Sequence, residues 1–206
     1  MKPIEVPTKR GILLDGALFC ETKNPDSILI SVIGIHGKFK SNPFYYNIGN
    51  TLNKGNIDFI YAQTCDAIRK ETKKNIITGK EEIVGSFNED FNNTEDDIEA
   101  YINYAEKNYK HIFLARHSLG ANKVIYYLLK NHDLRVEKYI LLSPANIANL
   151  IERNTEKERS IIKEYKEKGK DNEIIPFQLQ DSIKSHIYFL LETILYFNYY
   201  LDGLNV

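Results

Sequence analysis

The chain has 206 residues, of which 43% are hydrophobic and 27% are charged, ordinary values for one globular domain. Its 27 basic and 28 acidic residues leave a formal net charge of -1, which argues against a nucleic-acid-binding face. The chain has two cysteines, Cys20 and Cys65, which are too few for a disulfide scaffold and do not form a CxxC zinc motif. The sequence shows neither a secretory signal nor an uncharged run of membrane-spanning length. We therefore expect a cytoplasmic protein with free thiols.

Short apolar runs alternate with segments of helical periodicity along the first two thirds of the chain. The predicted strands are, in order, residues 12–14, 17–19, 28–35, 58–62, 111–115 and 139–142. The predicted helices cover about residues 45–52, 94–105, 119–128 and 152–173. We expect residues 12–19 to form a hairpin, because the Asp15-Gly16 pair tolerates the positive φ of a two-residue turn. Alternating strands and helices predict an α/β fold with a mostly parallel sheet and flanking helices.

The segment before the second helix is the hardest part of the sequence to interpret. Residues 64–92 are polar and show no clear period, so we expect a long loop that could contain a short hairpin. Thr94 and Asp97 have the spacing of a capping box, which predicts that a helix begins at Thr94. The apolar face of that helix is expected to consist of Ile98, Tyr101, Ile102 and Ala105.

The composition changes near residue 150. Residues 152–173 are rich in both lysine and glutamate, which is typical of a solvated helix, and residues 187–200 are rich in aromatic side chains. The aromatic stretch could be a lid over an acyl chain, although packing in a core or cap is the more common role of such a stretch. We therefore divide the chain into a core over residues 1–150 and a helical cap or insertion over residues 151–206.

One segment of the sequence contains a candidate catalytic residue. The run IFLARHSLGA, residues 112–121, passes from a strand through Ser118 directly into a helix, which is the setting of a nucleophile elbow. The serine of such an elbow sits on a strained turn that exposes its Oγ, and the helix N-terminus offers the Leu119 N–H to a developing oxyanion. The alternative is an ordinary serine at a helix N-cap.

A second segment also follows an apolar strand. The run GIHGK, residues 34–38, contains Gly37, which permits a sharp turn after the strand. Such a turn could direct the Lys38 N–H toward the same oxyanion as the Leu119 N–H. Two donors of this kind would form an oxyanion hole.

These motifs resemble the α/β-hydrolase superfamily. RHSLGANK at residues 116–123 is similar to the GHSLGANK elbow of small esterase-like serine hydrolases, and LLSPA at residues 141–145 is similar to the end of their sixth strand. The resemblance covers residues 10–150, with the motifs in the same order. It implies a hydrolase fold in which Ser118 is the nucleophile.

The chain departs from this pattern in two ways. Arg116 stands where the family usually has glycine, and the family order of serine, acid and histidine is hard to complete. His186 is the one histidine after Leu142, so it is the candidate base, and Asp202 is the candidate acid although it follows the histidine. We therefore expect the last strands of the fold to be missing. His36 is interpreted as orienting the loop that carries it, and His117 as structural.

The resemblance implies a serine hydrolase that acts on a carboxylic ester or a related acyl compound. The alternative is a non-catalytic or truncated remnant of the fold that lacks the acid and the histidine. No cofactor or metal is expected, because the sequence has neither a metal-ligand cluster nor a glycine-rich phosphate loop. The expected partners are a small ester or acyl substrate and a second copy of the chain, bound through residues 139–142 if they form an exposed sheet edge.

Overall fold

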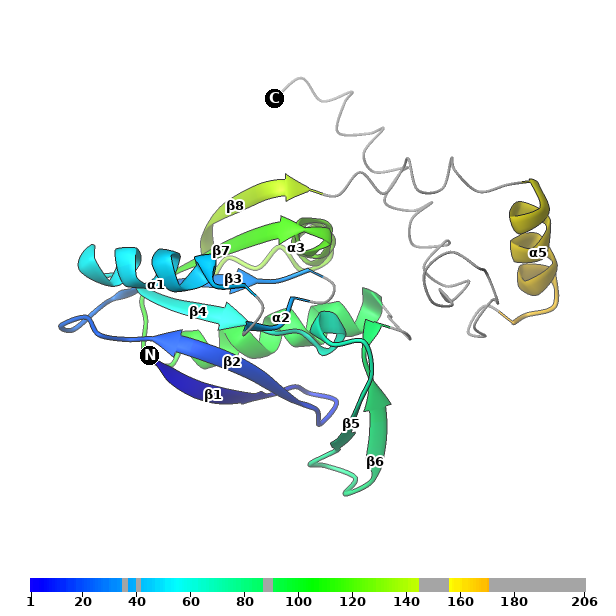
Figure 1. Ribbon diagram of the computed structural model, residues 1–206, viewed down its shortest axis with the longest axis horizontal. Coiled ribbons are helices and arrows are strands. Elements are labelled where there is room, and N and C mark those ends of the chain that lie inside the picture. Colours follow the sequence, from blue (N-terminus) through cyan, green and yellow to red (C-terminus); the bar gives the residue numbers. More distant parts are fainter. Residues whose placement is uncertain (35–36, 40–41, 87–90, 145–155, 171–206) are drawn as a thin grey trace. The chain divides into compact units, whose positions relative to one another are not determined.

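The architecture comes from a computed structural model, which describes residues 1–34, 37–39, 42–86, 91–144 and 156–170 (Figure 1). Residues 1–86 and 92–145 form one compact unit, and the candidate nucleophile lies in it. The charged segment forms helix α5, Glu156–Glu167, which belongs to the other unit. His186, Asp202 and the aromatic stretch 187–200 lie outside the described residues.

A six-stranded sheet organises the first unit, with the strand order β1-β2-β4-β3-β7-β8. The strands are β1 (Lys2–Pro7), β2 (Leu13–Phe19), β3 (Ser27–Val32), β4 (Asp58–Ala62), β7 (His111–Ser118) and β8 (Val136–Pro144). Strands β4, β3, β7 and β8 pair in parallel, and β1 and β2 add an antiparallel edge. The predicted fold class is therefore confirmed.

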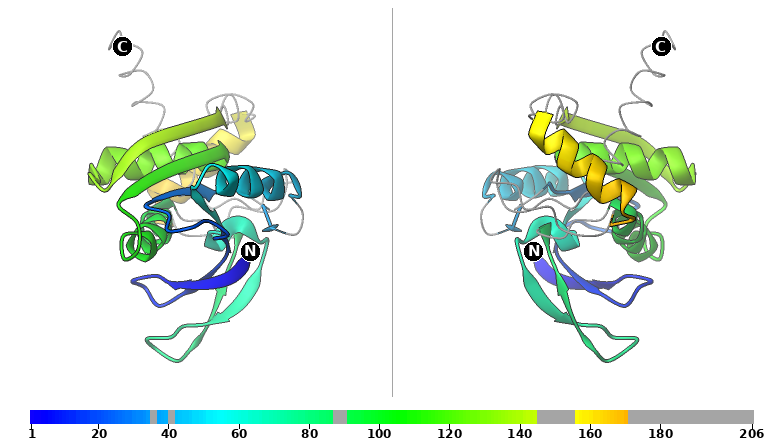
Figure 2. Two further views of the ribbon diagram at one scale, coloured as in Figure 1. Left: turned by 90° about the vertical axis from the view of Figure 1, so that its left-hand side faces the viewer. Right: turned by 90° about the vertical axis from the view of Figure 1, so that its right-hand side faces the viewer.

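Helices cover both faces of this sheet. They are α1 (Phe44–Lys54), α2 (Phe91–Ala105) and α3 (Leu119–Asn131). Apolar residues of α2 and α3 pack with Ile28 and Ile30 of β3 in one cluster. Tyr45 of α1 packs with Leu29 and Phe59 in the other cluster, so α1 lies on the opposite face (Figure 2). Successive β3 residues enter different clusters because strand side chains alternate between the two faces.

The hairpin predicted at Asp15-Gly16 is wrong. Both residues lie inside the continuous strand β2, and the turn falls between β1 and β2, where the Thr8 N–H donates to the Ile12 carbonyl at 2.9 Å. Gly16 is needed for space, because a Cβ there would come within 3.0 Å of the Ile4 side chain on β1. The glycine therefore allows close packing within the sheet and makes no turn.

The segment between β4 and α2 contains the short hairpin that the sequence allowed, formed by β5 (Glu71–Lys74) and β6 (Glu81–Val84). The hairpin projects away from the main sheet (Figure 1). The predicted start of the next helix is wrong, because α2 is already formed at Phe91 and Thr94 is buried within it. The predicted apolar face of α2 is confirmed, and its residues Ile98, Tyr101, Ile102 and Ala105 are fully buried.

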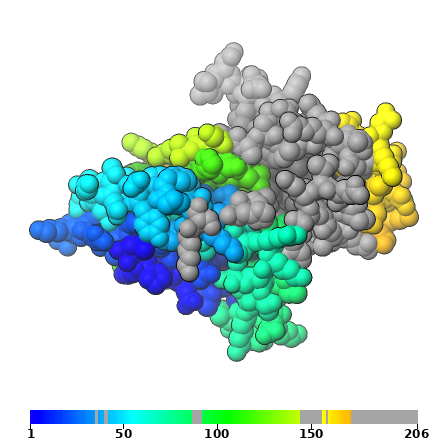
Figure 3. Space-filling model, in the orientation of Figure 1, coloured from blue at the N-terminus to red at the C-terminus, as the bar shows by residue number. Residues whose placement is uncertain are grey.

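Strand β8 is an edge of the main sheet and carries an apolar run. Within the part of the chain that the structure describes, β8 pairs with β7 alone. Tyr139, Ile140, Leu141 and Leu142 are each 41–45% exposed, and Figure 3 shows this yellow-green strand at the surface. Adjacent strand residues point to opposite faces, so neither face of β8 is fully covered.

Candidate active site

Ser118 is the last residue of β7 and directly precedes Leu119, the first residue of α3. Its backbone has φ 57° and ψ -137°, a conformation that residues other than glycine rarely adopt. Such a conformation costs on the order of 1–3 kcal/mol and persists where the surroundings enforce it. The Ser118 side chain makes no capping hydrogen bond to α3. These features favour a nucleophile elbow over an ordinary N-cap.

Small residues let the elbow approach the neighbouring strand closely. A Cβ on Gly120, in the first turn of α3, would lie 3.0 Å from the Val32 carbonyl oxygen at the end of β3. A Cβ on Gly34 would lie 3.4 Å from the His117 carbonyl oxygen and 3.6 Å from the Leu119 nitrogen. The backbone that follows β3 therefore lies directly against the elbow.

The loop that carries Lys38 is anchored on both sides of that residue. The carbonyl oxygen of Gly37 accepts a hydrogen bond from the Tyr61 hydroxyl at 2.9 Å. The N–H of Phe39 donates to Oε1 of Gln63 at 2.7 Å. Lys38 itself is exposed, and its N–H has no acceptor within the described ranges. This loop and the elbow follow the parallel neighbours β3 and β7, so both lie at the carboxyl edge of the sheet.

Arg116, the unusual residue of the elbow, is completely buried. Its Nε, Nη1 and Nη2 atoms have no hydrogen-bond partner among the residues that the structure describes. Burial lowers the pKa of the guanidinium to about 9, although Asp66, Asp97 and Tyr45 attract its positive charge. The long side chain therefore enters the protein interior beneath the elbow, where its charge is poorly compensated.

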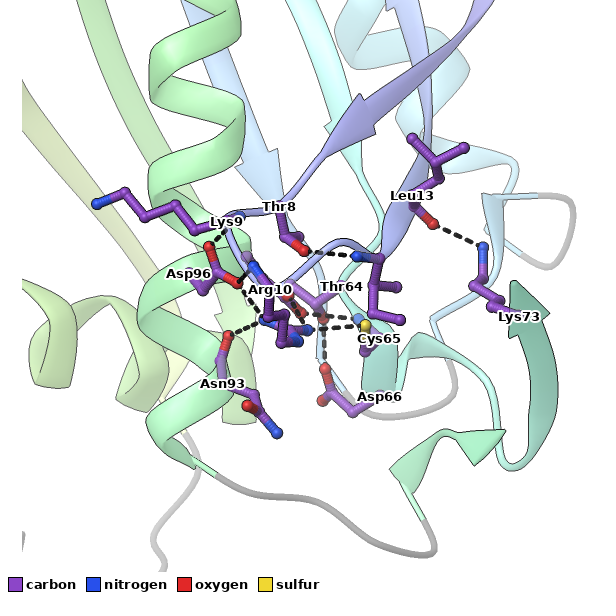
Figure 4. A network of polar contacts seen from close by, with 12 residues as sticks. Thr8, Lys9, Arg10, Leu13, Thr64, Cys65, Asp66, Lys73, Asn93 and Asp96 are labelled. Atoms are coloured by element: carbon purple, nitrogen blue, oxygen red, sulfur yellow. Dashed lines mark hydrogen bonds and ion pairs between the residues drawn. The ribbon is translucent and has the colours of Figure 1, made fainter. Parts of the chain in front are cut away.

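Figure 4 shows a network of polar and charged side chains that includes Asp66, one of the carboxylates that attract Arg116. Arg10, in the loop between β1 and β2, forms ion pairs with Asp96 and with the buried Asp97 of α2. The Cys65 N–H donates to Asp97 at 2.9 Å, and Arg10 also contacts the Cys65 sulfur. Burial raises the pKa of the Cys65 thiol to about 12, so this cysteine stays protonated near neutral pH. Cys20 and Cys65 are both free thiols, as expected.

A second buried pair joins the loop after β4 to the helix that begins at the elbow. Lys123 of α3 is 1% exposed and forms an ion pair with Asp66, which is also buried. The Thr64 hydroxyl donates to the same carboxylate. Although burial itself acts to raise the pKa of Asp66, Lys123 and the hydrogen bonds to the carboxylate keep this pKa below its usual value. The pair ties α3 to the sheet edge five residues after Ser118.

The described histidines do not complete a triad with Ser118. His111 is at the amino end of β7, where its Nδ1 lies 2.6 Å from Glu137, and His132 caps the far end of α3. His117 is adjacent to the serine and exposed on the strand. His36, like the candidate base His186 and the candidate acid Asp202, lies outside the described residues.

Metal sites and membrane-spanning helices can both be assessed for the residues that the structure describes. No group of three or more histidine, cysteine, aspartate or glutamate side chains is arranged to hold a metal ion there. No helix in the described ranges is both long and apolar enough to cross a membrane.

Comparison with known proteins gives a match in structure alone. No protein-family model and no curated protein matches the chain. Est1E from Butyrivibrio proteoclasticus is similar over 94% of this chain and 70% of its own, with a TM-score of 0.63 and 17% identity. The α/β hydrolase GrgF from Penicillium sp. sh18 is similar over 92% and 72%, with a TM-score of 0.55 and 14% identity.

A third structure, of DcsB in complex with its substrate analogue, has a TM-score of 0.54 and 14% identity. The match covers 84% of this chain, which spans only 56% of the length of DcsB. These similarities show that the chain has the α/β-hydrolase fold, as the motifs predicted.

Proposed function

We propose that this protein is a serine hydrolase that acts on a carboxylic ester or a related acyl compound, with Ser118 as the nucleophile. The observation that carries the proposal is the φ of 57° and ψ of -137° at Ser118, directly between β7 and α3. This strained turn occurs where an α/β-hydrolase fold places its nucleophile. Est1E shares that fold, and so does GrgF, which is described as an α/β hydrolase.

In the proposed reaction Oγ of Ser118 attacks the carbonyl carbon and gives its proton to a base. The Leu119 N–H, in the first turn of α3, has no acceptor within that helix and is available to the oxyanion. The Lys38 N–H is proposed as the second donor. His186 is the proposed base and Asp202 the proposed acid that orients it. The base then returns the proton to the leaving alcohol, and water hydrolyses the acyl-enzyme.

Labelling with a fluorophosphonate probe tests this function, because the probe reacts quickly only with a serine that a base activates. We expect rapid labelling of the wild-type protein and none of Ser118→Ala. The matched control is Ser160→Ala, which removes an exposed serine of α5 and should be labelled like the wild type. Slow labelling that Ser118→Ala does not change would instead support a non-catalytic remnant of the fold.

We also propose that β8 pairs with a second copy of the chain through the edge that has no strand partner among the described residues. The unpaired N–H and C=O groups of an apolar edge strand favour such pairing, and no charged residue lies between Tyr139 and Ser143 to prevent it. Ile140→Lys is therefore expected to convert a dimer or larger species to a monomer without changing the circular dichroism spectrum.

Light scattering coupled to size-exclusion chromatography measures this change. Leu134→Lys is the matched control, because Leu134 is 95% exposed, precedes β8 and should not affect pairing. A wild-type protein that is monomeric at tens of micromolar would contradict the pairing.

A further inference from the structure

A second serine with an unusual backbone lies beside the proposed nucleophile. Ser143, near the end of β8, has φ 46°, in the left-handed region that favours glycine. The register between β7 and β8 shifts at this point: His117 pairs with Leu142, whereas Ser118 pairs with Pro144. Ser143 is therefore the extra residue of a β-bulge directly opposite the elbow.

The register fixes how far apart the two serines are. Neighbouring strands of a sheet lie about 4.8 Å apart, so the Ser143 backbone must lie within a few ångströms of the Ser118 backbone. Ser143 is exposed at this edge, whereas Ala115 and Arg116, which precede Ser118 on β7, are buried. A ligand bound at Ser118 therefore lies next to Ser143.

The two neighbours of β7 place different groups on the two flanks of Ser118. The loop with Lys38, the proposed oxyanion donor, follows β3 on one flank, and Ser143, the next-to-last residue of β8, lies on the other. If the carbonyl oxygen of a substrate points toward the β3 flank, its other substituents are left to occupy the β8 flank. The bulge thus places a hydroxyl beside the part of the substrate that does not react.

We propose that Ser143 is a specificity-determining residue whose hydroxyl forms a hydrogen bond with a polar group of the substrate, in a subsite on the β8 flank of Ser118. This inference rests on the proposed function of Ser118. Bulges next to active sites redirect a side chain, and strained residues persist where function requires them. A hydroxyl on the second or third carbon of the acyl group is the substrate group expected to bind Ser143, because these carbons lie closest to the carbonyl carbon that Ser118 attacks.

The subsite can be tested without relying on catalysis. In the Ser118→Ala background, binding of ethyl 3-hydroxybutanoate and of ethyl butanoate is measured by NMR titration, with and without Ser143→Ala. We expect loss of the Ser143 hydroxyl to weaken binding of the hydroxylated ester about 3- to 10-fold, the effect of one hydrogen bond, and to leave binding of ethyl butanoate unchanged.

Two further variants separate the hydroxyl from the backbone. Ser143→Gly adopts φ 46° freely but has no hydroxyl, so it should bind as weakly as Ser143→Ala without loss of stability. Ser143→Asn keeps a polar group and tolerates the left-handed region, so it should recover part of the binding.

The role of Ser143 would be overturned if Ser143→Ala, Ser143→Gly and Ser143→Asn all left binding of ethyl 3-hydroxybutanoate unchanged. It would also be overturned if the Ser118→Ala protein did not bind this ester. The role of Ser118 is judged separately, by fluorophosphonate labelling of the wild type. A labelled wild type with no effect of Ser143 would therefore reject the subsite and retain the hydrolase.

Discussion

Replacing Arg116 with methionine is expected to raise the free energy of unfolding by about 1–4 kcal/mol, the range seen when buried charges are replaced by apolar residues of similar size. The guanidinium is fully buried, and within the described part of the chain none of its nitrogens has a hydrogen-bond partner. The attraction of Asp66, Asp97 and Tyr45 does not offset the cost of burial, because the pKa of Arg116 falls to about 9. Urea unfolding measures the change.

The stabilisation that Arg116→Met provides is expected to decrease as the pH rises. Burial lowers the pKa of Arg116 from its usual value to about 9 in the folded protein. Between these values the unfolded chain binds more protons, so this residue makes the wild type more stable as the pH rises. The advantage of Arg116→Met should therefore be smaller at about pH 11 than at about pH 8. Arg116→Lys retains a buried cation and should give no gain, and a methionine variant less stable than the wild type would contradict this account.

The opposite effect is expected when Asp66 is replaced with asparagine. This substitution keeps the size of the side chain but leaves Lys123, which is 1% exposed, without its ion-pair partner. Loss of one member of a buried pair costs about 3–5 kcal/mol, because the remaining charge stays buried. Because Lys123 and the hydrogen bonds hold the pKa of Asp66 below its usual value, this stabilisation is present above that value and is lost as the pH falls through the lowered pKa.

A double-mutant cycle shows whether the pair is the cause. Lys123→Met removes the cation that Asp66→Asn leaves unpaired, so the double variant should be more stable than the sum of the two single effects predicts. The free energy of unfolding of all four proteins is measured under one condition. Additive effects would mean that Asp66 and Lys123 contribute independently.

Most of the fold could be predicted from the sequence because its strands and helices have clear apolar periods. The run at β3 and the helical face of α2 are examples, since the residues expected to be buried are buried. The error at Gly16 has a physical cause: a glycine that permits a turn and one that permits close packing look alike in a sequence. Thr94 was misplaced because a capping pattern can also occur within a helix, and α2 is already formed at Phe91.

The strained turn at Ser118 was predictable because it involves only neighbours in the chain, Ser118, Leu119 and Gly120. The burial of Arg116 was not, because its surroundings include Asp66 and Asp97, which reach it from other elements. The bulge at Ser143 was also missed, since it depends on the register between two strands. The sequence contains one indication that this position is unusual, because the α/β-hydrolase elbow usually has glycine where this chain has Arg116.

The most direct test of the central claim is a crystal structure of the protein after reaction with a small organophosphonate. The account predicts a covalent bond from Oγ of Ser118 to phosphorus, with the phosphonyl oxygen about 2.7–3.1 Å from the backbone nitrogens of Leu119 and Lys38. It also predicts that the remaining substituent lies on the β8 flank. No adduct on Ser118, or an adduct whose oxygen points away from both N–H groups, would contradict it.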